Sequence, residues 1–194
     1  MPLAAHLNVL SLSFDCITVW YWNQDNFECL LGIAESIAGE EMWQHFADYC
    51  RLREKGLRKQ ALKSLAQLIA DAKNWPPVER RRFSNWIFGV HLRHSAVHQL
   101  IATPLSQQLL IPTLKEWAGC EAENSTPRRL LGLATGDQQH FSDALVLNPQ
   151  DDVSRYYLVL RDLADVDFQC HHLPDEFIGE PSEAIAILDR ATIL

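Results

Sequence analysis

Positive charge is missing from the first quarter of this chain. Residues 1–50 contain seven acidic residues and neither lysine nor arginine. A secretory signal peptide carries a positively charged stretch before its apolar core, so we expect none here. The apolar residues 3–22 include Asp15 near their middle, which argues against a membrane span. We therefore expect a soluble, cytoplasmic protein that does not contact a membrane.

Motifs built on glycine and cysteine are also missing. The eight glycines are scattered, and there is no Gly-rich phosphate loop, Gly-x-Ser-x-Gly elbow or His-Glu-x-x-His pair. The five cysteines are widely spaced without a Cys-x-x-Cys pair, which excludes zinc ribbons and thioredoxin-like redox motifs. These absences predict reduced thiols and no cofactor, and they favour a protein that is not an enzyme.

The charge that is present is divided along the chain. Residues 51–95 contain eleven Lys or Arg and three acids, residues 96–194 contain six and fifteen, and the formal net charge is -8. An acidic chain with a basic middle is not typical of a general nucleic-acid binder. Two interpretations stay open. The basic middle faces acidic segments within the fold, or it forms a groove for an acidic partner.

Apolar residues recur at three- and four-residue spacing, which predicts helices through most of the chain. The predicted helices cover residues 26–39, 42–50, 57–69, 78–101 and 105–117. Pro112 is expected to kink or divide the last of them. Residues 10–16 alternate as in a strand, but no later segment offers a partner strand, so we favour a helix there. The sequence therefore predicts an all-α bundle of antiparallel helical hairpins, with about 7–9 helices.

A polar, turn-rich stretch at residues 121–127 is the best linker candidate. It would separate a helical bundle at 1–120 from a second helical region at 128–194. The second region is expected to pack on the first, either as a separate part or within one domain.

A spaced set of residues follows this linker. The set consists of Leu131, Gly132, Phe141, Ala144 and Pro149. It resembles the second half of a tetratricopeptide repeat, in which an aromatic, a small residue and a proline pack and end a helix. The resemblance covers residues 126–160, with Arg128 and Val159 at positions where the repeat prefers tryptophan and glycine. It implies helical-hairpin packing and protein binding.

Three histidines, His91, His94 and His98, would share one face of the predicted helix 78–101. Three imidazoles on one face could bind a metal. No acid or cysteine lies beside them, and Arg93 adds positive charge. We therefore interpret them as packing or hydrogen-bonded side chains, with a metal site as the alternative.

Arg80, Arg81 and Arg82 follow one another at the start of the same helix, the wrong end for its dipole. Cations placed there need acidic partners, and guanidinium groups suit carboxylates and phosphates. We expect those partners within the fold or on another protein.

The densest group of functional residue types lies at residues 165–176. It includes Asp165, Asp167, Cys170, His171, His172 and Asp175. A Cys–His pair can act as a nucleophile only if the imidazole is placed to accept the thiol proton. A polar helix end is the plainer interpretation. If the chain has a discrete site, we expect it here, with His171 and His172 as contacts to a partner.

The function predicted from these patterns is a non-catalytic protein–protein interaction module, such as an adaptor, a regulator or an immunity-type inhibitor. Another protein is the expected partner, and a homo-oligomer is possible. The alternative is a small enzyme or metal-binding protein that uses Cys170, His171 and His172, or the three-histidine face.

Overall fold

The chain is described here by a computed structural model, which covers residues 24–94, 97–171, 173 and 176–194. Helices account for 78% of these residues, and no strand occurs among them. The predicted all-α class is confirmed. The choice between helix and strand for residues 10–16 lies outside the described residues.

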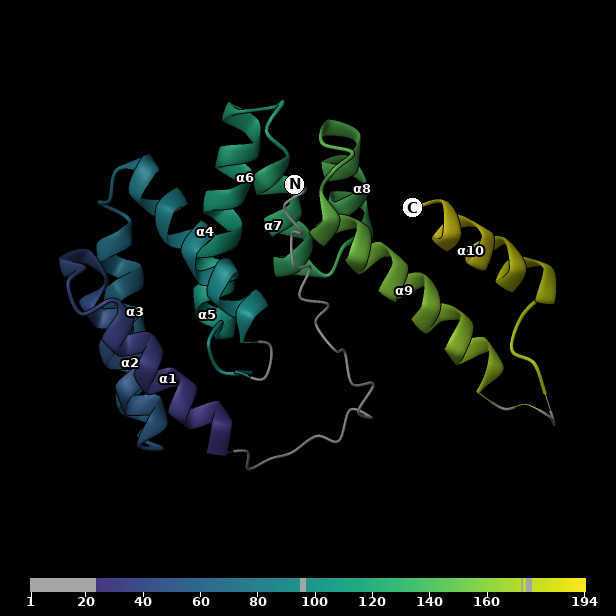
Figure 1. Cartoon of the computed structure of the whole chain (residues 1–194). Helices are drawn as coiled ribbons and strands as arrows, with labels where there is room; N and C mark the ends of the chain where they lie inside the picture. The colour runs from purple at the N-terminus through teal and green to yellow at the C-terminus, as the bar shows by residue number, and fades with distance from the viewer. Residues whose placement is uncertain (1–23, 95–96, 172, 174–175) are drawn as a thin grey trace, which may run out of the picture.

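The helices follow one another with short connections. The first half contains α1 (Gln24–Ser36), the 3-10 helix η1 (Glu41–Trp43), α2 (Gln44–Glu54), α3 (Arg58–Ala72) and α4 (Pro77–Arg93). The second half contains α5 (Thr103–Leu105), the π-helix η2 (Ser106–Leu110), α6 (Ile111–Cys120), α7 (Ser125–Thr135), α8 (Gln138–Leu147), α9 (Asp152–Cys170) and α10 (Pro181–Ile193). Most helices pack against their neighbours in sequence, and α4 packs against α6, so the fold is a row of helical hairpins from α1–α3 at one end to α9–α10 at the other (Figure 1).

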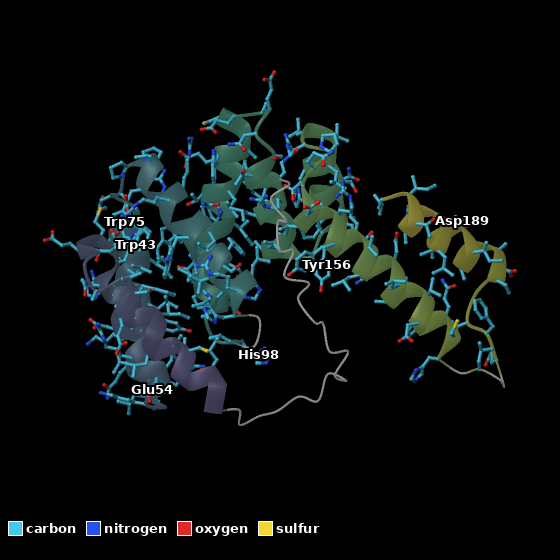
Figure 2. All side chains as sticks on the ribbon, viewed as in Figure 1. Trp43, Glu54, Trp75, His98, Tyr156 and Asp189 are labelled. Atoms are coloured by element: carbon cyan, nitrogen blue, oxygen red, sulfur yellow. The ribbon has the colours of Figure 1, made fainter. Side chains whose placement is uncertain are left out.

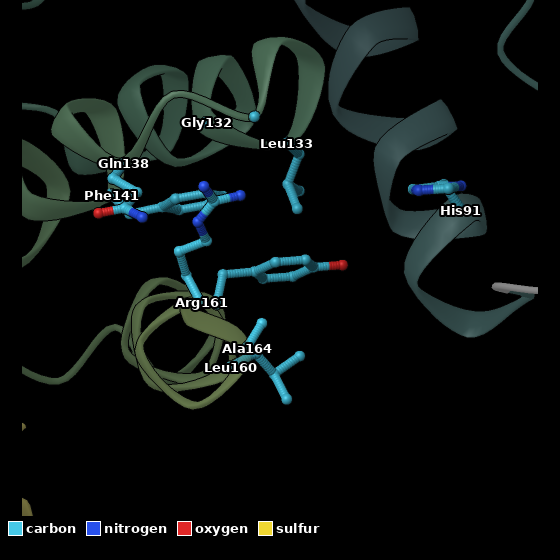
Figure 3. Close-up of a pocket in the computed structure, with 10 residues that line it drawn as sticks. His91, Gly132, Leu133, Gln138, Phe141, Leu160, Arg161 and Ala164 are labelled. Carbon is cyan, nitrogen blue, oxygen red and sulfur yellow. The ribbon is translucent and has the colours of Figure 1, made fainter. Parts of the chain in front are cut away.

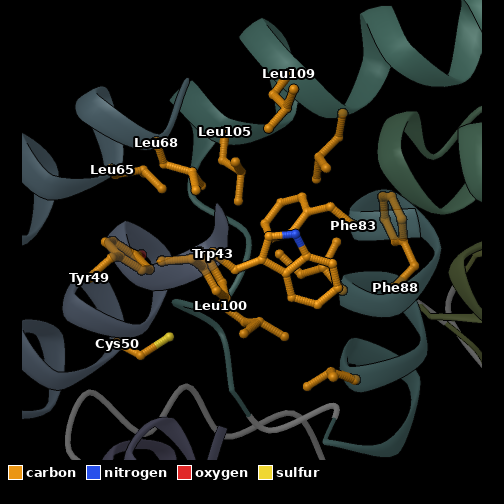
Figure 4. Packing of buried hydrophobic residues seen from close by; sticks show 14 of the residues in the cluster. Trp43, Tyr49, Cys50, Leu65, Leu68, Phe83, Phe88, Leu100, Leu105 and Leu109 are labelled. Atoms are coloured by element: carbon orange, nitrogen blue, oxygen red, sulfur yellow. The ribbon is translucent and has the colours of Figure 1, made fainter. Parts of the chain in front are cut away.

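A single apolar core joins α1 to α7. Its centre is aromatic. The ring of Phe83 lies 5.2 Å from that of Trp43 (Figure 4), and 5.4 Å from that of Phe46, both edge-to-face. Edge-to-face pairs add roughly 0.5–1.5 kcal/mol beyond the area they bury. The core extends as far as Leu130 and Leu131.

Helix α4 ends earlier than the sequence predicts. It stops at Arg93, and Val97 and Leu100 are buried in the core at the turn around residues 98–100. The buried hydroxyl of Tyr49 donates a hydrogen bond to the carbonyl of Gln99, which fixes this turn to α2. The predicted helix 78–101 is therefore wrong beyond residue 93.

Pro112 coincides with an irregular helix rather than a break. The chain stays helical from Thr103 to Cys120, but the segment from Ser106 to Leu110 is π-helical. Proline lacks an N–H group and crowds the preceding turn. A widened turn directly before Pro112 accommodates the ring, so the helix continues.

The predicted linker 121–127 is shorter in the structure. Only Glu121 to Asn124 form a turn, and α7 begins at Ser125. The Asn124 side chain accepts a hydrogen bond from the backbone N–H of Thr126, which caps α7. Because α6 and α7 pack against each other, the turn joins neighbouring helices of one row.

The residues that suggested a helical repeat lie at the contact between α7 and α8. Phe141 and Ala144 are buried, and α8 ends at Leu147, two residues before Pro149. Gly132 faces the Phe141 ring so closely that a Cβ atom there would lie 2.7 Å from the ring. The hairpin geometry expected of these residues is present, and membership of the repeat family stays a prediction.

The α9–α10 hairpin is held together differently from the core. Few of its side chains are buried, Leu158 and Ala184 being the apolar ones. Asp162 is also buried, and it accepts two hydrogen bonds from Arg190, one of them 3.0 Å from Nε. A bidentate pair of this kind fixes orientation as well as contributing energy.

Candidate interaction surface

The α9–α10 hairpin leaves many large apolar side chains exposed. They are Tyr156, Leu163, Phe168, Leu173, Ile185, Leu188 and Ile193. The most exposed are Phe168 at 65% and Ile193 at 85%. Single exposed apolar residues are ordinary on a protein surface, but their accumulation on one hairpin is typical of an interaction site. We call this hairpin the apolar hairpin.

The apolar hairpin also has unbalanced negative charge. Its three cations all pair with its own acids: Arg155 with Asp152, Arg161 with Asp165, and Arg190 with Asp162. The hairpin acids that have no ion pair with a described residue are Asp167, Glu176, Glu180, Glu183 and Asp189. The surplus charge of the described hairpin is therefore entirely negative.

The residues predicted as a site at 165–176 occupy the end of this hairpin. Asp165 forms an ion pair with Arg161 at 3.2 Å, and Asp167 is exposed. Cys170 is a half-buried free thiol, and His171 follows as the exposed C-cap of α9. The other two predicted residues, His172 and Asp175, lie outside the described residues. The structure thus places the described members on α9 and its end, and the contact role of the histidines stays a prediction.

The three histidines do not share a helix face. His91 lies on α4, His94 ends it, and His98 lies in the following turn. Burial, with a smaller contribution from His98, lowers the pKa of His91, and its Nδ1 is buried without a hydrogen-bond partner in the described part of the chain. Among the described residues, no group of three or more His, Cys, Asp or Glu could hold a metal ion.

A groove runs beside the apolar hairpin, between α4, α7, α8 and α9 (Figure 3). A cavity of about 310 Å³ is lined there by His91 and Arg161 among others. The rings of Phe141 and Tyr157 stack in its wall, with centroids 5.2 Å apart and planes 4° from parallel. A second cavity of about 590 Å³ also includes His91 and Leu133 in its lining. The two cavities therefore adjoin along α4 and α7.

The three consecutive arginines are engaged within the fold. Arg80 pairs with Glu116 at 2.9 Å and Arg81 pairs with Glu121 at 2.6 Å. These contacts bring α4 against α6 and the turn that follows it. Of the two interpretations of these arginines, the structure shows pairing with acids inside the chain.

Arg82 belongs to a small network at the end of η1. It pairs with Glu40 at 2.6 Å and Glu79 at 2.7 Å, and its guanidinium group lies over the Trp43 ring at 4.3 Å. The hydrogen bond from Arg82 lowers the pKa of Glu40. The Trp43 indole N–H donates to Glu79, so the tryptophan's polar atom is also satisfied.

The apolar hairpin was missed as a surface by the sequence reasoning, although a signal was present. Residues 156–160 read Tyr-Tyr-Leu-Val-Leu, and five successive apolar residues spread around all sides of a helix. One face of α9 packs against the fold, as Leu158 shows. The other side chains of the run cannot all point into that contact, and some of them, such as Tyr156, are exposed to solvent.

Comparisons with known proteins give no further identification. No protein-family model, curated protein or solved structure matches this chain. Within the part of the chain that the structure describes, every helix is too short or too polar to span a membrane.

Proposed function

We propose that this chain is a non-catalytic, cytoplasmic interaction module that binds another protein through the apolar hairpin. The partner we propose is a basic, amphipathic helical segment. The observation that carries the proposal is the coincidence, on α9 and α10, of exposed apolar side chains with acids that have no ion pair.

The apolar side chains supply the main driving force in this proposal. Phe168 and Leu188 are large, and covering such side chains stabilises a complex by about 25 cal/mol per Å² of apolar area removed from water. An amphipathic helix laid along a hairpin can cover several side chains at once, because its own apolar residues recur at three- and four-residue spacing.

Charge selects the partner. A lysine- or arginine-rich segment finds Asp167, Glu183 and Asp189 without ion-pair partners. The same charges disfavour a second copy of this chain bound face to face, because the two acidic hairpins would repel each other. Complementary charge chiefly raises association rate and specificity, so the predicted binding decreases as salt concentration increases.

The test uses designed peptides in place of an unknown partner. A helical leucine–lysine peptide with one apolar face is titrated into the fluorescently labelled protein. Two comparison peptides have glutamate in place of lysine, or the same residues in scrambled order. We expect only the basic amphipathic peptide to bind, because it alone offers both an apolar face and positive charge.

Matched variants assign the binding to the hairpin. Phe168→Ser with Leu188→Ser is expected to weaken binding about tenfold or more, since both side chains lie in the proposed contact. Val78→Ser serves as the control, because Val78 is 71% exposed but lies at the start of α4. Its affinity for the peptide should not change.

Three results would overturn the proposal. Equal binding of the scrambled peptide would mean that charge alone is responsible, and an equal loss in Val78→Ser would place the contact elsewhere. Light scattering that shows a dimer broken by the Phe168→Ser and Leu188→Ser changes would identify a second copy as the occupant.

A further inference from the structure

Most of the cations that have no ion pair with a described residue lie at the opposite end of the row from the apolar hairpin. Between residues 51 and 63 there are six Lys or Arg and one acid, Glu54. Among these cations, only Arg51 has an ion pair with a described residue, namely Asp48. Figure 2 marks this end at Glu54 and the hairpin end at Asp189. The basic middle therefore divides into arginines paired inside the fold and cations that are not.

A pocket lies within this basic end. Its volume is about 350 Å³, and its walls come from α2, α3 and the chain between α4 and α5. Its described lining includes Arg53, Arg58 and His98 as titratable nitrogen groups, and none of its described residues is acidic. Neither Arg53 nor Arg58 forms an ion pair with a described residue.

Arg53 points to a ligand most directly. Its Nε is buried and has no hydrogen-bond partner among the described residues. A buried guanidinium N–H without an acceptor is unfavourable. Because Arg53 also lines the pocket, an anion bound there would compensate the charge of the same group. Burial raises the pKa of neighbouring Tyr49 to about 12, while the Arg53 charge acts in the opposite direction.

The placement of Arg58 supports the same conclusion. Arg58 and Lys59 begin α3, where the helix dipole is positive, and the first turn of α3 contains no acid. Cations at this end are unfavourable unless an anion lies nearby. Two guanidinium groups without an ion pair among the described residues match a group with two negative charges better than a carboxylate, which has one.

We propose that this pocket binds a phosphate monoester, with Arg53 and Arg58 holding the phosphate oxygens. His98 and the polar groups of Gln99 and Thr103 line the remaining space. The phosphate belongs either to a small free molecule or to a phosphorylated side chain of a protein. The site is separate from the apolar hairpin and does not rest on it.

Calorimetric titration with O-phosphoserine at pH 7.5 tests the proposal, because the phosphate then carries nearly two charges. Arg53→Met and Arg58→Met should each raise the dissociation constant about tenfold or more. Lys115→Met removes the same charge from α6, outside the pocket lining, and should leave the constant within about twofold.

A phosphoserine peptide identifies the source of the phosphate, and single-stranded RNA serves as a comparison ligand. A phosphoserine peptide that binds at least tenfold tighter than O-phosphoserine indicates a phosphorylated protein, and equal affinities indicate a small free molecule. Both results support the pocket. The proposal is overturned if O-phosphoserine does not bind, if Lys115→Met weakens binding as much as Arg58→Met, or if single-stranded RNA, whose diesters carry one charge each, binds more tightly than O-phosphoserine.

Discussion

The two ends of this row of helices use apolar residues in opposite ways. In α1 to α4, aromatic side chains such as Phe46 and Phe83 are fully buried and contact one another. In α9 and α10, large apolar side chains such as those of Phe168 and Ile193 face solvent. Both ends are helical and both contain large apolar side chains. Burial, rather than composition, separates the part that stabilises the fold from the part available to a partner.

The difference has an electrostatic counterpart. Arg80, Arg81 and Arg82 each pair with an acid, so ion pairs as well as apolar packing join the helices of the first part. On the hairpin, the cations are paired and acids remain in surplus. A surface that is apolar and acidic at once gains little within the monomer from either property, which is why we assign it to binding.

The largest expected effect comes from the same substitution made at both ends. Phe83→Ala should lower the free energy of unfolding by about 3–5 kcal/mol, because it leaves a cavity among packed rings. Phe168→Ala should change it by no more than about 0.5 kcal/mol, as for other exposed positions. Urea unfolding followed by circular dichroism measures both. Comparable losses in the two variants would mean that the hairpin is as tightly packed as the core.

A smaller effect is expected at Gly132, where the two parts meet. Gly132→Ala places a methyl group against Phe141, which should cost roughly 1–3 kcal/mol, while the better helix propensity of alanine returns about 1 at most. Thermal unfolding should therefore show a lower midpoint. Gly119→Ala is the control, since no atom lies within 4 Å of a Cβ there. If adding Phe141→Leu to Gly132→Ala does not restore part of the lost stability, contact with the Phe141 ring is not the cause of that loss.

The smallest effect concerns pH and the groove beside the hairpin. Because the pKa of His91 is lowered on folding, the unfolded chain takes up the proton first as the pH falls. The stability that the neutral His91 side chain provides is fully present above about pH 6.5. It is lost as the pH falls below this value, towards the lower pKa of His91 in the folded state. His91→Gln should lose less stability than the parent between pH 7.5 and 5.5 in urea unfolding. An identical loss in both proteins would contradict the assignment.

That pH range keeps two carboxyl groups with lowered pKa values out of the comparison. Hydrogen bonds lower the pKa of Glu40, through Arg82, and of Glu121, through Asn124 and Trp117. For a lowered carboxyl pKa, the stabilisation is present above the ordinary value of 4.5 and is lost only as the pH falls below it.

Periodicity was sufficient to predict the helical class, because apolar stripes such as those of α3 record the face that each helix buries. It was not sufficient for the end of α4. Val97 and Leu100 continue the apolar pattern, and only the long-range hydrogen bond from Tyr49 to Gln99 shows how the turn that buries them is held. An apolar pattern indicates that a residue is buried, but it does not indicate which backbone conformation places that residue in the core.

The candidate surface was predicted only in part for a similar reason. The segment around Asp165 was chosen for its titratable residues, and it does lie on the apolar hairpin. Which arginines are paired, however, depends on residues such as Glu116 and Glu121, about 40 positions away along the chain. For this reason Arg80–Arg82 were candidates from the sequence, whereas Arg53 and Arg58 were not.

The π-helical turn before Pro112 has a consequence for how this chain's pattern should be aligned with others. Leu105 and Leu109 form one apolar series, and Leu110, Leu114 and Ala118 form another, displaced by a single residue. In a regular α-helix, a shift of one residue would rotate the second series by about 100° around the helix axis. The wider turn absorbs the extra residue and restores the phase. The segment is thus equivalent to a regular helix carrying a one-residue insertion, and an alignment that forbids a gap there would misplace every residue that follows.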